Sequence, residues 1–340
     1  MSTNGHPRII LVSPLEWGLG HTVRLVPFIR KALVEGHRVI LASDGVSLDF
    51  LRYHFPDLSW IRMPFYTVRY PGTAGFFGKL IPQIPGILRA IRKNHRQVAE
   101  IVSKYHISEI ICDHRYGLYH KGVRSIFITN QLWLKAPKGW SFGEAFVYRL
   151  HRLALRKFSE IWIADYSGSP NLSGLLTHPG HLPGNSKYIG PVSRFQGIVP
   201  VRPGYAKPFE VLALVSGPEP QRTLFENLLI KRFNNAGTSS VIFRGMPPST
   251  PGENPAVTQE GPVLLINHAG DENIVWYIIQ AQEIICRTGN STLSDLLYLG
   301  KTALLVPTPG QTEQEYVAGH LEKQGLFRVC RQEELLEAPR

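Results

Sequence analysis

The chain has 340 residues, a net charge of +11, a hydrophobic fraction of 43% and a charged fraction of 19%. These values are typical of a soluble globular protein, and the length allows two domains of ordinary size with ample cores. No run of eighteen apolar residues occurs, which excludes a predicted transmembrane helix.

The three cysteines, Cys112, Cys286 and Cys330, lie far apart, and no metal-binding spacing is visible among them. Residues Met1 to Pro7 are polar and lead directly into an apolar run, so we do not expect a signal peptide. These features predict a reduced cytoplasmic protein with no metal site and no bound cofactor.

The charge is unevenly distributed. Residues 1–195 hold 25 Lys and Arg against 11 Asp and Glu, a balance of +14, whereas the remainder holds 12 against 15, a balance of −3. Three stretches of the first half contain no acidic residue: 58–99, 114–143 and 166–209. We therefore expect the first half to meet an anionic partner, either a phospholipid surface, a phosphate-bearing acceptor or nucleic acid. Nucleic acid is less favoured, because no recognised nucleic-acid motif accompanies the charge.

The first 190 residues alternate between predicted strands and helices. The apolar run Arg8–Ser13 predicts a buried parallel strand, a helix is predicted over about 22–35, and Arg38–Ser43 is the next strand. Further strands are predicted at Glu109–Cys112, Ser125–Ile128 and Glu160–Ala164. This α/β alternation predicts an open parallel sheet in a Rossmann-like domain over residues 1–190.

A second α/β domain is predicted over residues 209–340. The segment Gly190–Pro208 holds four prolines and three glycines, which indicates an interdomain linker at 191–208. Strands are predicted beyond it at Val211–Val215, Ser240–Phe243, Val263–Ile266, Glu283–Cys286 and Thr302–Val306. Helices are predicted at about 221–234, 274–281, 291–299 and 313–323. The Pro-, Gly- and Ser-rich segment 245–261 is expected to be a surface excursion.

Each half contains one glycine loop that joins a strand to a helix. Gly18-Leu19-Gly20-His21 follows the first strand, and Arg287-Thr288-Gly289-Asn290-Ser291-Thr292 follows a late one. Helix N-termini carry free N–H groups and a partial positive charge, so each loop is a candidate anion site. The pair predicts two Rossmann-like domains that face each other across a cleft.

The second loop has residue types that suit a diphosphate. Gly289 allows a close backbone approach, and Ser291 and Thr292 either cap the helix or offer hydroxyls to phosphate. Asp295, one turn further on, can accept both hydroxyls of a ribose. The alternative is a capped helix followed by an exposed acid.

A third polar segment, Pro307–Tyr316, follows another predicted parallel strand. Open α/β sheets bind ligands at this edge, and Gln and Glu side chains there suit the hydroxyls of a sugar. The alternative is a capping segment, with Thr312 as the N-cap and Glu315 three residues on.

The segment from Cys286 to Gly325 resembles the donor-binding half of the GT-B glycosyltransferases. It is similar in particular to family 28, which contains the N-acetylglucosaminyltransferase of lipid II synthesis and the diacylglycerol galactosyltransferases. The residues that carry the resemblance are Arg287-Thr288-Gly289-Asn290-Ser291-Thr292-Leu293-Ser294-Asp295, Val306-Pro307, Glu313-Gln314, Leu321-Glu322-Lys323-Gln324-Gly325 and, at the other end, Gly20-His21 and Glu35-Gly36-His37-Arg38-Val39.

The resemblance implies a two-domain GT-B fold and roles for matching positions. It implies that Asp295 holds the nucleotide ribose and that Gly289–Thr292 receive the diphosphate, with Arg287 and Thr288 also among the donor-binding residues. Further donor contacts are implied for Ser216 and Gly217 at the phosphates, for Asn267 and His268 at the base, and for Gln311, Glu313 and Gln314 at the sugar.

The first loop departs from the family. It is shorter than in the lipid II enzymes, with Glu16 and Trp17 before it, and Arg24 stands where many relatives have proline. The identity of the acceptor therefore cannot be carried over.

Family members of this type are usually inverting, and such chemistry needs a base to deprotonate the acceptor hydroxyl. His21 is the first candidate, since an imidazole suits proton transfer near neutral pH. Asp113, after the strand Glu109–Cys112, is the rival, and Glu16 is a third possibility. The expected acceptor-side residues are Gly20, Arg24, Arg115, Tyr116, Asn130 and Gln131.

The segment 65–97 mixes aromatic, aliphatic and basic residues without an acid. This pattern predicts either contact with anionic lipid or a helix packed on the core with a solvated basic face. The sequence as a whole predicts an inverting, metal-independent hexosyltransferase of the cell envelope, peripheral on the membrane. It would move sugar from a nucleotide donor, of the UDP-sugar class, to a lipid-linked or anionic acceptor. A sugar-nucleotide epimerase and a non-catalytic nucleotide-sugar or lipid-binding protein are the alternatives.

Overall fold

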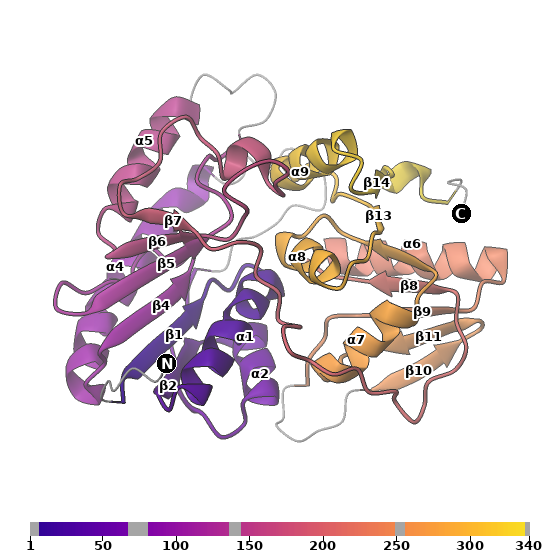
Figure 1. Ribbon diagram of the computed structural model, residues 1–340, viewed down its shortest axis with the longest axis horizontal. Helices are drawn as coiled ribbons and strands as arrows, with labels where there is room; N and C mark the ends of the chain where they lie inside the picture. Colours follow the sequence, from indigo (N-terminus) through magenta and orange to yellow (C-terminus); the bar gives the residue numbers. More distant parts are fainter. Residues whose placement is uncertain (1–6, 67–80, 136–143, 249–255, 337–340) are drawn as a thin grey trace.

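The computed structural model describes residues 7–66, 81–135, 144–248 and 256–336. Two sheets of seven strands lie side by side, and each is covered by helices on both faces (Figure 1). The predicted α/β fold of two parallel sheets is confirmed.

The first sheet has the order β3-β2-β1-β4-β5-β6-β7, and all neighbouring strands are parallel. Its strands are β1 (Ile9–Pro14), β2 (Arg38–Ser43), β3 (Ser59–Arg62), β4 (Glu109–Asp113), β5 (Arg124–Thr129), β6 (Glu160–Ile163) and β7 (Ser186–Tyr188). Helices α1 (Leu19–Val34) and α2 (Gly45–His54) pack on one face, and α4 (Ile84–Tyr105) and α5 (Glu144–Leu155) pack on the other.

The second sheet has the order β10-β11-β9-β8-β12-β13-β14, in which only the edge strand β10 is antiparallel. Its strands are β8 (Val211–Leu214), β9 (Ser240–Phe243), β10 (Val257–Glu260), β11 (Val263–Ile266), β12 (Glu283–Cys286), β13 (Leu304–Leu305) and β14 (Arg328–Val329). Helix α6 (Gln221–Ala236) covers one face, and α7 (Asp271–Gln280), α8 (Asn290–Tyr298) and α9 (Thr312–Lys323) cover the other.

The burial of the central strands explains why they could be predicted from the sequence. In β4 all five residues are buried, and in β9 and β11 all four are, as continuous apolar runs require in a doubly covered sheet. The main difference lies in the segment 245–261, where the expected surface excursion ends in the edge strand β10. All four residues of β10 are exposed, so no buried apolar pattern marked it.

The strand order creates one switch point in each sheet. The chain leaves β1 toward β2 and then returns to place β4 on the other side, and it leaves β8 toward β9 and returns to place β12. Loops that leave the carboxyl ends of such paired strands flank a crevice. The loops after β1 and β4 leave the switch point of the first sheet, and the loops after β8 and β12 leave that of the second.

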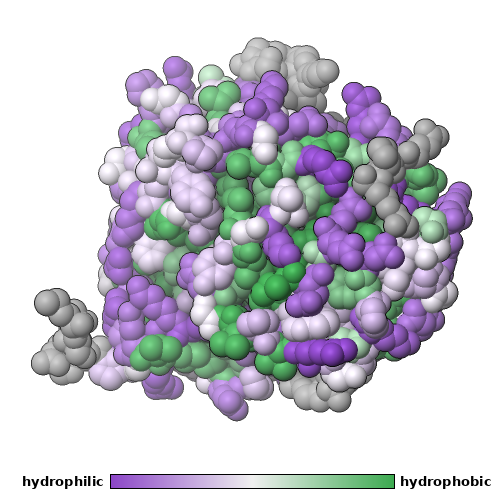
Figure 2. Space-filling model, turned by 45° about the vertical axis from the view of Figure 1, so that its right-hand side comes forward, coloured by the Kyte–Doolittle hydropathy of each residue, from purple (hydrophilic) through white to green (hydrophobic). Residues whose placement is uncertain are grey.

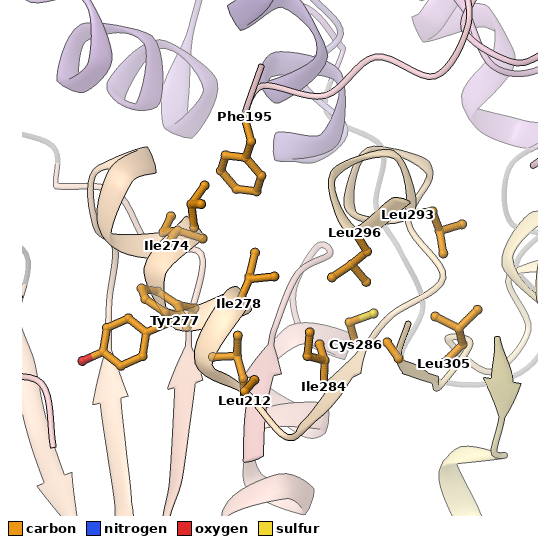
Figure 3. Packing of buried hydrophobic residues seen from close by; sticks show 14 of the residues in the cluster. Phe195, Leu212, Ile274, Tyr277, Ile278, Ile284, Cys286, Leu293, Leu296 and Leu305 are labelled. Atoms are coloured by element: carbon orange, nitrogen blue, oxygen red, sulfur yellow. The ribbon is translucent and has the colours of Figure 1, made fainter. Parts of the chain in front are cut away.

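The segment between the two sheets packs into the second one. Phe195 is 1% exposed and reaches down from this segment beside Ile274 of α7 (Figure 3). The same core contains Leu212 from β8 and Leu296 from α8. Because Phe195 is buried with residues of the second sheet, the segment after β7 is anchored to that domain before β8 begins.

Within the described residues, no helix is sufficiently long and apolar to pass through a membrane. On the face shown in Figure 2, hydrophobic residues are bordered by hydrophilic ones that dominate its rim.

Candidate active site

The two glycine loops meet where the domains touch. The hydroxyl of Ser291, in the first turn of α8, donates to the Gly20 carbonyl oxygen at 2.6 Å. Helices α1 and α8 begin beside each other at this point (Figure 1), after Gly18 and Gly289 respectively. Neither helix has a side-chain cap or an acidic residue in its first turn. Two helix N-termini without side-chain caps thus lie beside each other between the domains.

The second glycine loop also carries polar atoms that are buried without a partner. Thr288 is 3% exposed, and neither its Oγ1 nor the Oδ1 of Asn290 has a hydrogen-bond partner among the described residues. The amide nitrogen of Asn290 donates to Ser173 Oγ at 3.2 Å, across the domain boundary. Unpaired buried polar groups are costly, so they identify this loop as a place where a polar ligand fits.

The structure brings His21 and Asp113 together as a pair. Nδ1 of His21, in the first turn of α1, lies 2.6 Å from Oδ1 of Asp113, the last residue of β4. Arg24, one turn further along α1, donates to Asp113 Oδ2 at 3.1 Å. Burial acts to raise the pKa of Asp113, but the charges of Arg24 and His21 and two histidine hydrogen bonds hold it well below its usual range. Asp113 is therefore an ionised carboxylate that accepts hydrogen bonds on both oxygens.

His21, Asp113 and His114 also have the spacing of a metal-binding cluster, with ligand atoms within 4.8 Å of one another. Their partners fit this use poorly. Both Asp113 oxygens already accept hydrogen bonds. The positively charged Arg24 guanidinium also lies against the carboxylate that a metal cation would need as its ligand. A hydrogen-bonded dyad accounts for the arrangement better than a metal centre.

The other domain adds a carboxylate near the dyad. Asn130, after β5, donates to Glu313 Oε1 in the first turn of α9 at 3.0 Å. Burial raises the pKa of Glu313, and the charge of His21 acts to lower it. The two groups therefore interact electrostatically. Gln314 and Gln311 bond to each other at 2.6 Å and order the loop before α9.

Asp295 is buried, and the segment between the domains holds it. Its Oδ1 accepts hydrogen bonds from Ser193 Oγ at 2.7 Å and from the Arg194 backbone N–H at 3.1 Å. Burial raises the pKa of this carboxyl to about 6, despite the nearby Arg194 guanidinium. A ribose at Asp295 would have to share the carboxylate with these donors.

Two arginines predicted to face ligands lie inside the domains instead. Arg115 is 0% exposed; it donates to Ser13 Oγ at 2.8 Å and to Asn94 Oδ1 at 3.1 Å, and it lies 3.4 Å from Glu16 Oε1. Arg287 is 1% exposed, and it donates to the Val306 carbonyl at 3.1 Å and lies 3.9 Å above the Phe225 ring centroid. Burial lowers the pKa of Arg287 to about 9. Both guanidiniums are therefore bound to acceptors inside the protein and stabilise the packing around their own loops.

The remaining predicted residues lie at the edges of the site. Tyr116 bonds through its hydroxyl to His151 of α5, and the Gln131 backbone N–H donates to Thr129 Oγ1. Ser216 and Gly217 follow β8 at the second switch point, with Gly217 at φ 110°, where a side chain would be strained. Asn267 accepts a hydrogen bond from Arg244.

His268 is part of a domain contact that the sequence did not indicate. Its Nε2 lies 3.2 Å from Nε2 of His54 in α2. Beside this pair, Asp271 forms ion pairs with Arg30 at 2.6 Å and with Arg194 at 3.3 Å. The residues come from four separate segments, and no local motif links them.

This histidine pair predicts a loss of stability in acid. Burial lowers the pKa of His54 to about 4 and that of His268 to about 3, while the unfolded chain binds these protons near pH 6.5. Unfolding therefore takes up protons between pH 6.5 and 4, and stability falls as the pH is lowered through that window. Asp295, with its raised pKa, acts in the opposite direction between pH 6 and 4.

A variant isolates the contribution of the pair. Urea unfolding of wild type and His54→Gln at pH 7 and pH 5 is expected to show a loss on acidification that is larger in wild type by about 1–2 kcal/mol. Glutamine retains a hydrogen bond to His268 and cannot titrate. Equal losses in both proteins would mean that the pair is protonated or exposed in the native state.

Comparisons with known proteins bear on the fold and on the family of the C-terminal part. Residues 269–338 match the model of the glycosyltransferase family 28 C-terminal domain. An uncharacterized glycosyltransferase of Methanosarcina mazei is 22% identical over 92% of this chain and 83% of its own length. A UDP-N-acetylglucosamine–N-acetylmuramyl-(pentapeptide) pyrophosphoryl-undecaprenol N-acetylglucosamine transferase of Caldanaerobacter subterraneus is 40% identical over 17% of this chain and 17% of its own length.

Solved structures share the whole architecture. A glycotransferase of kitacinnamycin superposes with a TM-score of 0.59 and 16% identity, covering 98% of this chain and 90% of its own. MurG of Acinetobacter baumannii has a TM-score of 0.52 and 14% identity, covering 97% and 88%. At these identities the likeness establishes the fold.

The chain has the GT-B fold, and its C-terminal part matches a family of glycosyltransferases. Its C-terminal domain is that of family 28, with distant MurG-like homologues, as the sequence resemblance implied.

Proposed function

We propose that this chain transfers a hexosyl group from a nucleoside-diphosphate sugar, of the UDP-sugar class, to an acceptor hydroxyl. The observation that carries the proposal is the pair of helix N-termini without side-chain caps that lie beside each other at Gly18–His21 and Gly289–Thr292. Such an arrangement favours a dianionic group between the domains. The unpaired Thr288 hydroxyl at the same loop supplies a donor for a phosphate oxygen.

His21 is the proposed base, and Asp113 orients it. An ionised carboxylate only accepts hydrogen bonds, so His21 Nδ1 carries the proton that faces Asp113, and Nε2 keeps its lone pair. Nε2 takes the proton of the acceptor hydroxyl while its oxygen attacks the anomeric carbon and the bond from that carbon to the diphosphate oxygen breaks. The leaving diphosphate keeps the electron pair, and the two helix N-termini stabilise its charge without a metal. Attack opposite the leaving group inverts the anomeric centre.

The donor side of the proposal uses the second domain. Gln311, Glu313 and Gln314 lie at the start of α9, and Glu313 interacts electrostatically with His21, so these side chains suit the hydroxyls of the donor sugar. Asp295 is the proposed ribose partner, in competition with Ser193 and Arg194. The nucleobase of the donor would lie near Asn267 and His268, at the loop after β11.

The acceptor side has features that favour a lipid-linked or anionic acceptor at the cytoplasmic membrane face. Of the predicted segment 65–97, residues 67–80 lie outside the described part. In its described part, α4 exposes Ile84 and Leu88 in its first turns and then a basic face. Helix α5 packs on the same face of the sheet and exposes Leu150 and Leu153. Apolar and basic residues together support contact with anionic lipid.

A matched pair of variants at Thr288 tests the donor site. Calorimetric titration with UDP, ADP, GDP and dTDP is expected to show micromolar binding of one nucleotide to wild type. Thr288→Val keeps the shape but removes the unpaired hydroxyl, so we expect binding to weaken about tenfold without loss of stability. Thr288→Ser keeps the hydroxyl and should bind like wild type.

Other results would redirect the proposal. Failure of all four nucleotides to bind would refute the proposed donor site and with it the proposed transferase activity. Conversion of a UDP-sugar to its epimer without any acceptor would indicate an epimerase on this fold.

A further inference from the structure

A second histidine contacts the same carboxylate oxygen as His21. His114 directly follows Asp113, and its Nδ1 lies 2.9 Å from Asp113 Oδ1. Its side chain is 11% exposed, and its ring centroid lies 4.8 Å from that of His21. The backbone at His114 is left-handed, with φ 53°, an uncommon conformation for a residue with a side chain. This conformation places the ring beside Asp113, and the sequence analysis gave His114 no role.

The other face of the His114 ring meets β5. Its Nε2 lies 2.9 Å from Oγ1 of Thr129, the last residue of that strand. The Gln131 backbone N–H donates to the same Thr129 oxygen at 2.9 Å. Four groups therefore form one hydrogen-bonded chain that ends on Asp113.

The directions of these hydrogen bonds follow from elementary chemistry. Burial lowers the pKa of His114 to about 4, so the ring is neutral near pH 7 and carries one proton. Asp113 is ionised and only accepts, so the proton sits on Nδ1. Nε2 is then an acceptor for the Thr129 hydroxyl, which also lies 2.9 Å from the Gln131 carbonyl oxygen, and the Thr129 oxygen accepts the Gln131 N–H.

We infer that His114 and Thr129 are positioning residues that hold Asp113 Oδ1 where it meets His21 Nδ1. The chain from Gln131 through Thr129 and His114 fixes one oxygen, and Arg24 fixes the other. With both oxygens fixed, Asp113 can hold His21 only in its Nδ1–H form, which leaves Nε2 unprotonated. We call this hydrogen-bonded chain from Gln131 to Asp113 the relay. Its role in catalysis rests on the proposed function, but its existence does not.

Thr129→Val and Thr129→Ser form the matched test. Valine has the shape of threonine without its hydroxyl, and it suits the end of a strand as well. Serine keeps the hydroxyl. The first readout needs no substrate: long-range ¹H–¹⁵N correlation spectra of the full chain at neutral pH assign the tautomers of both rings.

We expect Nδ1–H for both His21 and His114 in wild type and in Thr129→Ser, and a mixture of tautomers for His114 in Thr129→Val. A wild-type His114 protonated on Nε2, or spectra altered by EDTA as a bound metal would require, overturns the relay. Wild-type spectra decide this point even if Thr129→Val does not fold.

The second readout links the relay to turnover of the donor and acceptor pair. Thr129→Val is expected to lower kcat about tenfold with nucleotide affinity unchanged, and Thr129→Ser to restore it. Unchanged kcat and an unchanged pH profile in Thr129→Val would make the relay merely structural and overturn the positioning role. Nδ1–H tautomers in a chain that neither binds nucleotide nor turns over sugar would instead refute the proposed function and leave the relay standing.

Discussion

Replacement of His21 by alanine is expected to lower glycosyl transfer by a factor of about 10²–10⁴, the usual contribution of a general base. The reason is that the lone pair on His21 Nε2 takes the acceptor proton in the proposed mechanism, whereas His114 Nε2 is engaged with the Thr129 hydroxyl. Nucleotide affinity should remain within about twofold of wild type, because the variant keeps the backbone N–H groups of both helix N-termini and removes only the imidazole. Release of nucleoside diphosphate in the presence of acceptor measures turnover, and calorimetry measures binding.

Two further variants separate the candidates for the base. Asp113→Asn is expected to reduce turnover strongly while leaving a residual rate that still depends on a group of histidine-like pKa. Glu16→Gln should have little effect, since Glu16 Oε2 accepts the Phe65 N–H and its other oxygen lies near Arg115. If His21→Ala stays within about fivefold of wild type while Asp113→Asn is inactive, Asp113 is the base and His21 its partner.

Replacement of Arg115 by methionine is expected to destabilise the fold by about 3–5 kcal/mol, as found when one partner of a buried ionic network is removed. Arg115 donates to Ser13, to Asn94 and to the carbonyls of Ala42 and Met63, so its loss leaves several buried acceptors without a donor. The free energy of unfolding in urea measures the effect.

An exposed arginine provides the control for Arg115. The Arg62 side chain is 72% exposed and pairs with Asp44, so Arg62→Met should cost less than about 1 kcal/mol. Comparable losses for the two variants would mean that the network around Arg115 is not formed in the folded protein.

The sequence predicted most of the elements that build the sheets. The runs around Ile110, Val241 and Leu264 are continuous and apolar, and such runs predict buried parallel strands whatever their surroundings. Helix α2 and the edge strand β10 carried no such signal. In α2 only four of the ten residues are buried, and β10 is wholly exposed.

The glycine loops were also visible in the sequence, because a strand–glycine–helix pattern is local. Their meeting through Ser291 and Gly20 was not, since these residues are 271 positions apart. For the same reason His21 and Asp113, 92 positions apart, stood as rival bases until the fold placed them at 2.6 Å.

Burial of charge was the least predictable property. Arg115 and Arg287 were expected to face ligands, yet both lie inside the domains. Their acceptors come from strands, loops and helices that are remote in sequence, and a guanidinium shows no local preference between phosphate and buried carbonyls.

The sequence by itself determined the α/β alternation, the two glycine loops and the kinship to a family of glycosyltransferases. Those features depend on apolar runs and backbone freedom within a few residues. Only the tertiary structure decided which polar groups meet: His21 with Asp113, Glu313 with Asn130, and His54 with His268. A hydrogen bond needs two atoms within about 3 Å, and the packing of whole elements sets that distance between residues remote in sequence.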